Sequence, residues 1–251
     1  MRNPCVPAIE VADLTQRFGA VLAVDRLSLS IPPGMFYGIV GPNGAGKTTV
    51  LTAMCGLRRQ TAGTVRIAGH DLRTAREAAL AQLGVVTDGL SLPERLTAGE
   101  VLRYSAGLRG LDDGWRGRAG DLLEILGLDS VPRTLVVEYS TGMRKKINLA
   151  LALLHRPRVL VLDEPFEAID PVSAHSIEQV LKQYVEAGGT VVLSSHIMDF
   201  VERNCRRVAV MVGGRVLVEG PVEEVTAGST LNERFVELVG ADPVRPLEWL
   251  A

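Results

Sequence analysis

Residues 41–49 read Gly-Pro-Asn-Gly-Ala-Gly-Lys-Thr-Thr and match the phosphate-binding pattern G-x-x-x-x-G-K-[ST] at every defined position. The stretch before them, residues 35–40, is mostly apolar and predicts a buried strand. Residues 49–55 predict a helix that ends at Gly56. A strand, a glycine-rich loop and a helix in this order are the setting that the pattern requires, so we expect an α/β fold that binds nucleotide phosphates.

The residue types of this loop suit a phosphate group. Gly41, Gly44 and Gly46 have no Cβ, so the backbone can curl with its N–H groups pointing inward toward an anion. The amino end of the following helix adds its positive dipole. Lys47 is placed to reach the β- and γ-phosphates, and the Thr48 hydroxyl is placed to bind Mg²⁺. The alternative, an ordinary glycine-rich turn, is disfavoured by the flanking strand and helix. The predicted ATP contacts in the loop are Gly41, Pro42, Asn43, Gly44, Ala45, Gly46, Lys47, Thr48 and Thr49.

Composition narrows the possible classes of protein. The 251 residues are 47% hydrophobic, enough for a large core, and the formal net charge of −2 disfavours nucleic acid as the main partner. No apolar run approaches the roughly 18 residues of a membrane span, and we find no signal-peptide pattern at the amino terminus. Cys5, Cys55 and Cys205 lack metal-ligand spacing, so we expect reduced thiols in a cytoplasmic protein.

The predicted strands and helices place the loop in an α/β core. Two strand patterns precede the loop, at residues 9–14 and 27–31, and the second alternates as a half-buried antiparallel strand does. A third follows at residues 64–67. Toward the end of the chain, apolar strands alternate with helices and indicate a parallel sheet covered on both faces. These later elements are a strand at 159–162, a helix at 172–186, a strand at 191–193, a hairpin of 208–212 with 215–219, and a tail helix with Leu231, Phe235 and Leu238 inward.

A helical insertion separates these two parts of the core. We expect helices at residues 100–108, around residues 122–126 and at residues 143–155, the last stopped by Pro157.

Two acids and a histidine follow the apolar strands. Asp163 and Glu164 come directly after the strand at 159–162, and ligands of open α/β sheets gather at the carboxyl ends of strands. We therefore expect Asp163 to hold Mg²⁺ and Glu164 to act as the general base that polarises the attacking water. His196 ends the next strand and is placed to contact the γ-phosphate. Solvated surface acids and a structural histidine are the alternatives.

A second candidate anion site opens the last predicted helix of the insertion. Residues 139–143 read Tyr-Ser-Thr-Gly-Met, which puts a serine and a glycine at a helix amino end. An ordinary capping turn is the alternative, because serine is a common N-cap.

The order of these motifs resembles that of ATP-binding cassette (ABC) ATPases over nearly the whole chain. The matching motifs are Walker A at 41–49, a signature loop at 139–143, Walker B at 159–164, the D-loop residues Ala168, Ile169 and Asp170, and the switch histidine His196. In this family an aromatic residue stacks on adenine, and here it falls on Phe18, for which core packing is the alternative. The resemblance implies a P-loop NTPase core of mainly parallel sheet with an N-terminal antiparallel β subdomain and an inserted α-helical subdomain. The implied boundaries are 1–88 and 158–220 for the core, 89–157 for the helical subdomain and 221–251 for a helical tail.

The sequence departs from the family pattern in two places. Thr141 and Met143 stand where the usual signature has glycine and glutamine, whereas Ser140 and Gly142 are retained. Asp88 stands where the family has a glutamine, and an aspartate there can bind Mg²⁺ but adds a charge. The signature with the basic triplet at residues 144–146 resembles ATP-binding subunits of small bacterial export systems. We interpret the triplet itself as a solvated helix face.

The resemblance also implies a mechanism and partners. Two cassettes, identical or different, would enclose two ATP molecules head to tail, with Ser140, Thr141, Gly142 and Met143 of each reaching the partner's ATP. Lys47, Glu164 and His196 would serve catalysis, Asp170 the D-loop, and Thr48, Asp88 and Asp163 the Mg²⁺ site.

A separate membrane subunit would carry the cargo, a small molecule or drug to be exported, with this chain on the cytoplasmic face of the membrane. We expect that subunit to dock in a groove between the core and the insertion, near Asp88 and residues 89–108, with Arg95 and Arg103 at the surface. The alternative functions are a non-hydrolysing regulatory cassette and a soluble ABC protein acting on nucleic acid or ribosomes.

Overall fold

Two sheets form the β-structure of the protein, whose computed structural model describes residues 6–87 and 91–240. The first is antiparallel, has the order β2-β1-β4-β5, and consists of β1 (Ile9–Phe18), β2 (Val21–Ile31), β4 (Ala62–Ile67) and β5 (His70–Asp71). The second has the order β10-β9-β3-β8-β7-β6, and its strands are parallel except for β10, which pairs antiparallel with β9. Its strands are β3 (Phe36–Val40), β6 (Leu83–Val86), β7 (Val159–Leu162), β8 (Thr190–Ser194), β9 (Arg207–Val212) and β10 (Arg215–Pro221).

The parallel sheet is buried on both faces, which explains its continuous apolar strands. Tyr37 and Ile39 of β3 point to a cluster that includes helix α1 (Lys47–Met54) and the antiparallel sheet. Phe36 and Val40 point to the opposite cluster. That second cluster contains side chains of α5 (Thr141–Leu153), α6 (Pro171–Glu186), α7 (Met198–Asn204), α8 (Val222–Thr226) and α9 (Leu231–Val239).

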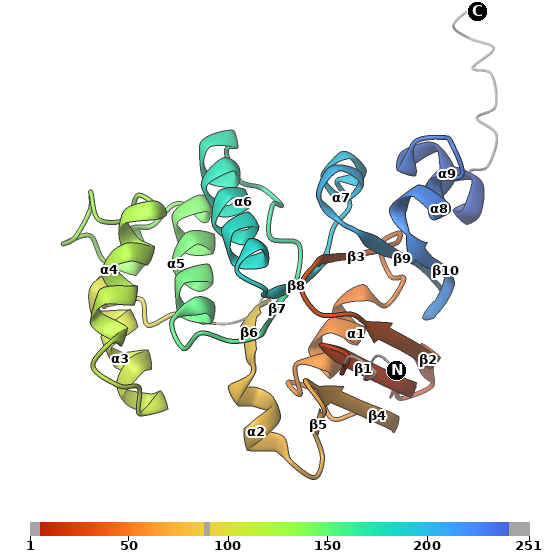
Figure 1. Cartoon of the computed structure of the whole chain (residues 1–251), viewed down its shortest axis with the longest axis horizontal. Helices are drawn as coiled ribbons and strands as arrows, with labels where there is room; N and C mark the ends of the chain where they lie inside the picture. Colours follow the sequence, from red (N-terminus) through yellow and green to blue (C-terminus); the bar gives the residue numbers. More distant parts are fainter. Residues whose placement is uncertain (1–5, 88–90, 241–251) are drawn as a thin grey trace, which may run out of the picture.

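A group of helices separates β6 from β7 in the chain, although these strands are neighbours in the sheet. The group consists of α3 (Ala98–Arg109), α4 (Trp115–Ile125), the 3₁₀ turn η1 (Val136–Glu138) and α5, and it lies at the side of the molecule away from the antiparallel sheet (Figure 1). Helix α3 begins with a capping box between Thr97 and Glu100 and ends at Gly110, whose φ of 60° suits glycine. The treatment of residues 89–157 as a separate subdomain stays a prediction.

The structure confirms the predicted fold class and differs mainly in short elements. Helix α2 (Arg76–Ala81), α7, α8 and strand β6 were not predicted, because segments this short do not show a clear period. Strand β1 continues past residue 14 because Asp13, at φ 51°, accommodates a register shift and lets pairing resume. Within the described ranges, no helix is both long and apolar enough to cross a bilayer.

Candidate functional site

A cavity of about 320 Å³ lies where the carboxyl ends of three neighbouring strands meet. The glycine-rich loop follows β3, Asp163 and Glu164 follow β7, and His196 follows β8. The structure therefore brings together side chains that are far apart in the sequence. The lining residues are Ala23, Pro42, Asn43, Gly44, Ala45, Gly46, Lys47, Thr48, Thr49, Asp163, Glu164, Glu167 and His196.

The loop keeps its shape because glycine is required at two of its positions. Gly46 has a φ of 100°, and a Cβ there would lie 2.7 Å from the carbonyl oxygen of Ala23 in β2. A Cβ on Gly41 would lie 2.4 Å from the carbonyl oxygen of Met211 in β9. The loop is thus held between both sheets, with its N–H groups at the amino end of α1.

Lys47 is buried, and its ammonium is held by the loop itself. Its Nζ donates hydrogen bonds to the carbonyl oxygens of Gly41 at 2.7 Å and Pro42 at 3.4 Å. The same nitrogen lies 4.0 Å from Oε1 of Glu164. The only positive side chain among the lining residues therefore lies between the phosphate loop and the acid pair.

Ser194 and His196 orient the two acids. The Ser194 hydroxyl donates to Oδ1 of the buried Asp163 at 2.6 Å and accepts from the backbone N–H of Glu164 at 2.9 Å. Oε2 of Glu164 accepts from the backbone N–H of His196 at 3.3 Å and lies 2.9 Å from its Nδ1. The second oxygen of Asp163 has no hydrogen bond to another described residue, so it is available to a metal ion.

Other predicted site residues lie outside this cavity. The Phe18 ring is partly exposed at the end of β1, and the Arg58 guanidinium lies 4.7 Å from its centroid. Asp88 lies outside the described residues. Ser140, Thr141, Gly142, Met143 and Asp170 do not line the cavity of their own chain.

Comparison with known proteins agrees with this geometry. A sequence model of the ABC transporter family matches residues 24–167. The daunorubicin/doxorubicin resistance ATP-binding protein DrrA of Streptomyces peucetius is 35% identical over 228 residues, which cover 90% of this chain and 68% of DrrA. The chain belongs to the ABC transporter family.

Further relatives support the same assignment. The Nod factor export ATP-binding protein I of Paraburkholderia xenovorans is 35% identical, with 97% of this chain and 80% of that protein covered. A solved ATP-binding subunit of an ABC transporter superposes with a TM-score of 0.86 at 28% identity, over 92% of this chain and 99% of that one. A dimeric ATP-binding cassette solved in a post-hydrolysis state with ADP and Pi superposes with a TM-score of 0.76 at 26% identity, over 85% of this chain and 98% of that one. As an ABC subunit, the chain binds ATP and is an ATPase whose hydrolysis is coupled to transport.

The predicted signature loop packs against the predicted D-loop of its own chain. Ser140 is the N-cap of α5 and accepts a hydrogen bond from the Met143 N–H at 3.2 Å. Asp170 is the N-cap of α6, and its hydrogen bonds with Ser173 lower the pKa of its carboxyl. Gly142 is buried at this contact. The two helices approach so closely that a Cβ on Gly142 would lie 2.6 Å from Oγ of Ser173 and 3.0 Å from Oδ2 of Asp170. The two motifs are therefore positioned as a unit.

Replacing Gly142 with alanine should displace that unit and weaken ATP-dependent dimerisation. The added methyl must push the start of α5 from α6, and overpacking of this kind typically costs about 1–3 kcal/mol. A monomer can relieve this strain by moving the loop, whereas a dimer that needs the loop in place bears part of it, so we expect about a tenfold weaker dimer. Analytical ultracentrifugation with ATP, in a Glu164→Gln background, would measure the dissociation constant of the dimer. Gly107→Ala, where a Cβ on α3 meets no atom within 4 Å, is the matched control. Equal dimerisation of both variants would contradict the expectation.

The basic triplet is not a solvated helix face, and this corrects the sequence interpretation. Arg144 donates to the carbonyl oxygens of Tyr139 and Val137 and lies 3.7 Å from a carboxylate oxygen of Glu94. Lys145 donates to the Glu164 carbonyl oxygen at 2.6 Å, and Lys146 is buried. The sequence also missed Glu167, which its position three residues after Glu164 could have suggested.

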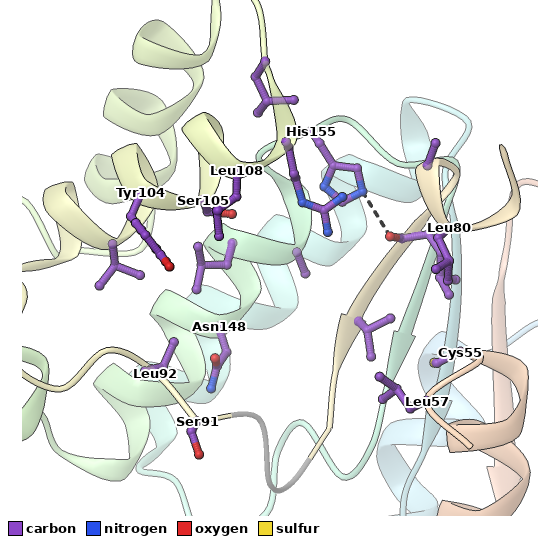
Figure 2. A pocket seen from close by; sticks show the side chains of 18 of the residues that line it. Cys55, Leu57, Leu80, Ser91, Leu92, Tyr104, Ser105, Leu108, Asn148 and His155 are labelled. Carbon is purple, nitrogen blue, oxygen red and sulfur yellow. Dashed lines mark hydrogen bonds between the residues drawn. The ribbon is translucent and has the colours of Figure 1, made fainter. Parts of the chain in front are cut away.

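A second and larger cavity, of about 1060 Å³, lies between the core and the helical insertion. Figure 2 shows Tyr104, Ser105 and Leu108 of α3 facing Leu57 and Leu80 across it. Tyr104, Leu108 and Leu57 are 55%, 71% and 53% exposed, so the groove presents an apolar surface to solvent. Arg95 and Arg103 do not line this groove.

Proposed function

We propose that this ABC subunit uses ATP to drive export of a small molecule or drug through a separate membrane subunit, from the cytoplasmic face of the membrane. The observation that carries the proposal is the meeting of Lys47, Asp163, Glu164 and His196 in one cavity beside the phosphate loop. Relatives named for drug resistance and for Nod factor export support export as the direction of transport.

In the proposed reaction the chain positions ATP and activates water. The loop N–H groups and Lys47 bind the β- and γ-phosphates and counter the charge that develops during transfer. Glu164 accepts a proton from the attacking water, and His196, bonded to Glu164, orients that carboxylate near the γ-phosphate. Phe18 stacks on the adenine at the outer end of the site.

The residues of the site fit Mg²⁺, and Thr48 and Asp163 would be its protein ligands. Mg²⁺ prefers oxygen ligands and is usually bound by one or two carboxylates together with substrate phosphates and water. The described residues contain no group of three or more His, Cys, Asp or Glu that could hold a metal without a nucleotide. When bound, the ion would neutralise negative charge on the phosphates. Asp88 is a further proposed ligand.

We also propose that a second cassette completes the site. The signature residues do not line the cavity of their own chain, so we expect that nothing on that loop closes over the γ-phosphate in a monomer. In a head-to-tail dimer, Ser140 to Met143 contact the partner's ATP. ATP then binds the closed dimer more tightly than the open one and shifts the equilibrium toward it. A homodimer suffices, because one chain carries both halves of the site.

The groove between core and insertion is the proposed docking site for the membrane subunit. Arg109 lines it and is exposed in the free chain, although desolvation by neighbouring atoms lowers the pKa of its guanidinium. Among the described residues its side chain has no hydrogen bond or ion pair. His155 donates from Nε2 to the Leu83 carbonyl oxygen at 3.0 Å, and burial, with the charge of Arg109, lowers its pKa to about 4. The His155 imidazole is therefore neutral near pH 7 and does not repel the neighbouring Arg109 guanidinium. An amphipathic helix that brings a carboxylate to Arg109 would fit this surface.

Reversing the charge of Arg109 should separate the chain from its membrane subunit. Arg109 is exposed in the free chain, so its proposed pair with a carboxylate is desolvated only on docking. Removing one member of such an interface pair costs about 2–5 kcal/mol, so Arg109→Glu should weaken association by about 30-fold or more. Binding would be measured with the membrane protein that co-purifies with the chain from detergent-solubilised native membranes. ATP hydrolysis by the isolated chain should change less than about twofold, because Arg109 is absent from the ATP cavity.

Arg103→Glu is the matched control. It reverses the charge of another exposed arginine on the same helix α3, but the Arg103 side chain does not line the groove. Loss of the membrane subunit in both variants, or in neither, would contradict docking in the groove.

A further inference from the structure

The Glu164 peptide is held in an unfavourable conformation. Its φ of 45° is in the left-handed region, which costs a residue with a side chain on the order of 1–3 kcal/mol. Such a conformation persists only where neighbouring groups enforce it. The Ser194 hydroxyl accepts from the N–H of this residue, and His196 binds its carboxylate. The remaining polar group is the carbonyl oxygen.

Lys145 binds that carbonyl oxygen from another element. Its Nζ donates a hydrogen bond of 2.6 Å to Glu164 O, and the bond is partly buried. Hydrogen bonds from a charged donor are roughly twice as strong as neutral ones. The side chain comes from α5, the helix that the signature loop begins, whereas Glu164 follows β7. The backbone of Glu164 is therefore hydrogen-bonded to a side chain of the signature helix.

We infer that Lys145 is a positioning residue, which holds the Glu164 carboxylate in its productive place through the peptide and links it to the signature helix of the same subunit. The inference rests on the proposed role of Glu164 as general base. Lys145 lies about 7.5 Å along the helix from Ser140, at the usual rise of about 1.5 Å per residue. Because α5 is rigid over this length, a shift of Ser140 on contact with the partner's ATP moves the Lys145 ammonium. Binding of ATP at the partner's site thus changes the position of Glu164 in this subunit's own site.

Loss of the Lys145 ammonium should lower the rate of ATP turnover and leave ATP binding unchanged. Lys145→Met removes the donor and keeps an unbranched side chain only one atom shorter, so the carboxylate loses one of its supports. Because a misplacement of about 1 Å can lower a rate by about 10²-fold, we expect kcat to fall by about 10- to 100-fold. KM for ATP should stay within about twofold, since Lys145 does not line the ATP cavity. ATP-dependent dimerisation in a Glu164→Gln background should be retained.

Three further variants make the test specific. Lys145→Arg keeps a charged donor and should retain more than about a third of the wild-type kcat. Lys182→Met, on the surface of α6 where Lys182 pairs with Glu178, should match wild type. Lys145→Ala keeps helix propensity and replaces the methionine variant if that one melts at a much lower temperature.

Wild-type turnover in Lys145→Met would overturn the inference. So would an equal loss in Lys145→Arg, or a KM that rises as much as kcat falls. The proposed function is tested separately: if wild-type protein hydrolyses ATP and Glu164→Gln does not, a negative result at Lys145 concerns only the link.

Discussion

Replacing Glu164 with glutamine should stop ATP hydrolysis and leave an ATP-bound dimer. Glutamine has the same shape and keeps an oxygen that can accept the His196 N–H, but it cannot take a proton from water. General-base catalysis typically contributes 10²–10⁴-fold, so we expect kcat to fall by at least about 100-fold. Phosphate release would measure turnover, and a sizing column with ATP and Mg²⁺ would measure the dimer.

The neighbouring acid provides a matched control for Glu164. Glu167 lines the same cavity but is exposed, so Glu167→Gln removes a nearby charge without removing the proposed base. We expect this variant to lose less than about threefold in kcat. Comparable losses in the two variants would assign the effect to net charge in the cavity. A Glu164→Gln protein that remains monomeric with ATP would contradict the two-cassette site.

The parts of the site that the sequence predicted share one physical feature. The loop at 41–49, the acids after β7 and the histidine after β8 each follow an apolar strand, and parallel strands present their carboxyl ends at one edge. Sequence position alone therefore places Lys47, Asp163 and His196 together. The fold class follows from the same pattern, because alternating apolar strands and helices favour a covered parallel sheet.

The features that the sequence missed depend on side chains meeting across elements. A lysine after a signature loop has the composition of a solvated face, and only the packing of α5 against β6 and α6 places Lys145 at the Glu164 carbonyl. The groove is a similar case, because its walls come from α2, α3, α5 and β6. Two of these elements, α2 and β6, are too short to predict from periodicity, so Arg109, which lines the groove, could not be distinguished from Arg103, which does not.

Replacing Lys47 with alanine should prevent ATP-dependent dimerisation altogether. The ammonium is the only positive group among the residues that line the cavity, and hydrogen bonds to charged groups are worth about 1.5–3 kcal/mol each. Loss of two such bonds to the β- and γ-phosphates should weaken ATP binding by about 100-fold or more. The doubly substituted Lys47→Ala/Glu164→Gln protein should then elute as a monomer with ATP, whereas Glu164→Gln alone elutes as a dimer.

Folding must be separated from binding in this variant, because Lys47 also binds the carbonyl oxygens of Gly41 and Pro42. An unpaired buried carbonyl costs about 1–3 kcal/mol, so the melting temperature of Lys47→Ala without nucleotide should fall even if the fold is intact. Binding is read instead from the rise in melting temperature on adding ATP, which grows with the ratio of ligand to Kd. Wild type should show this rise and Lys47→Ala should not. If the double variant still dimerises with ATP, the γ-phosphate contact of Lys47 is not what favours the closed pair, and the contacts from the partner's signature loop must supply that free energy alone.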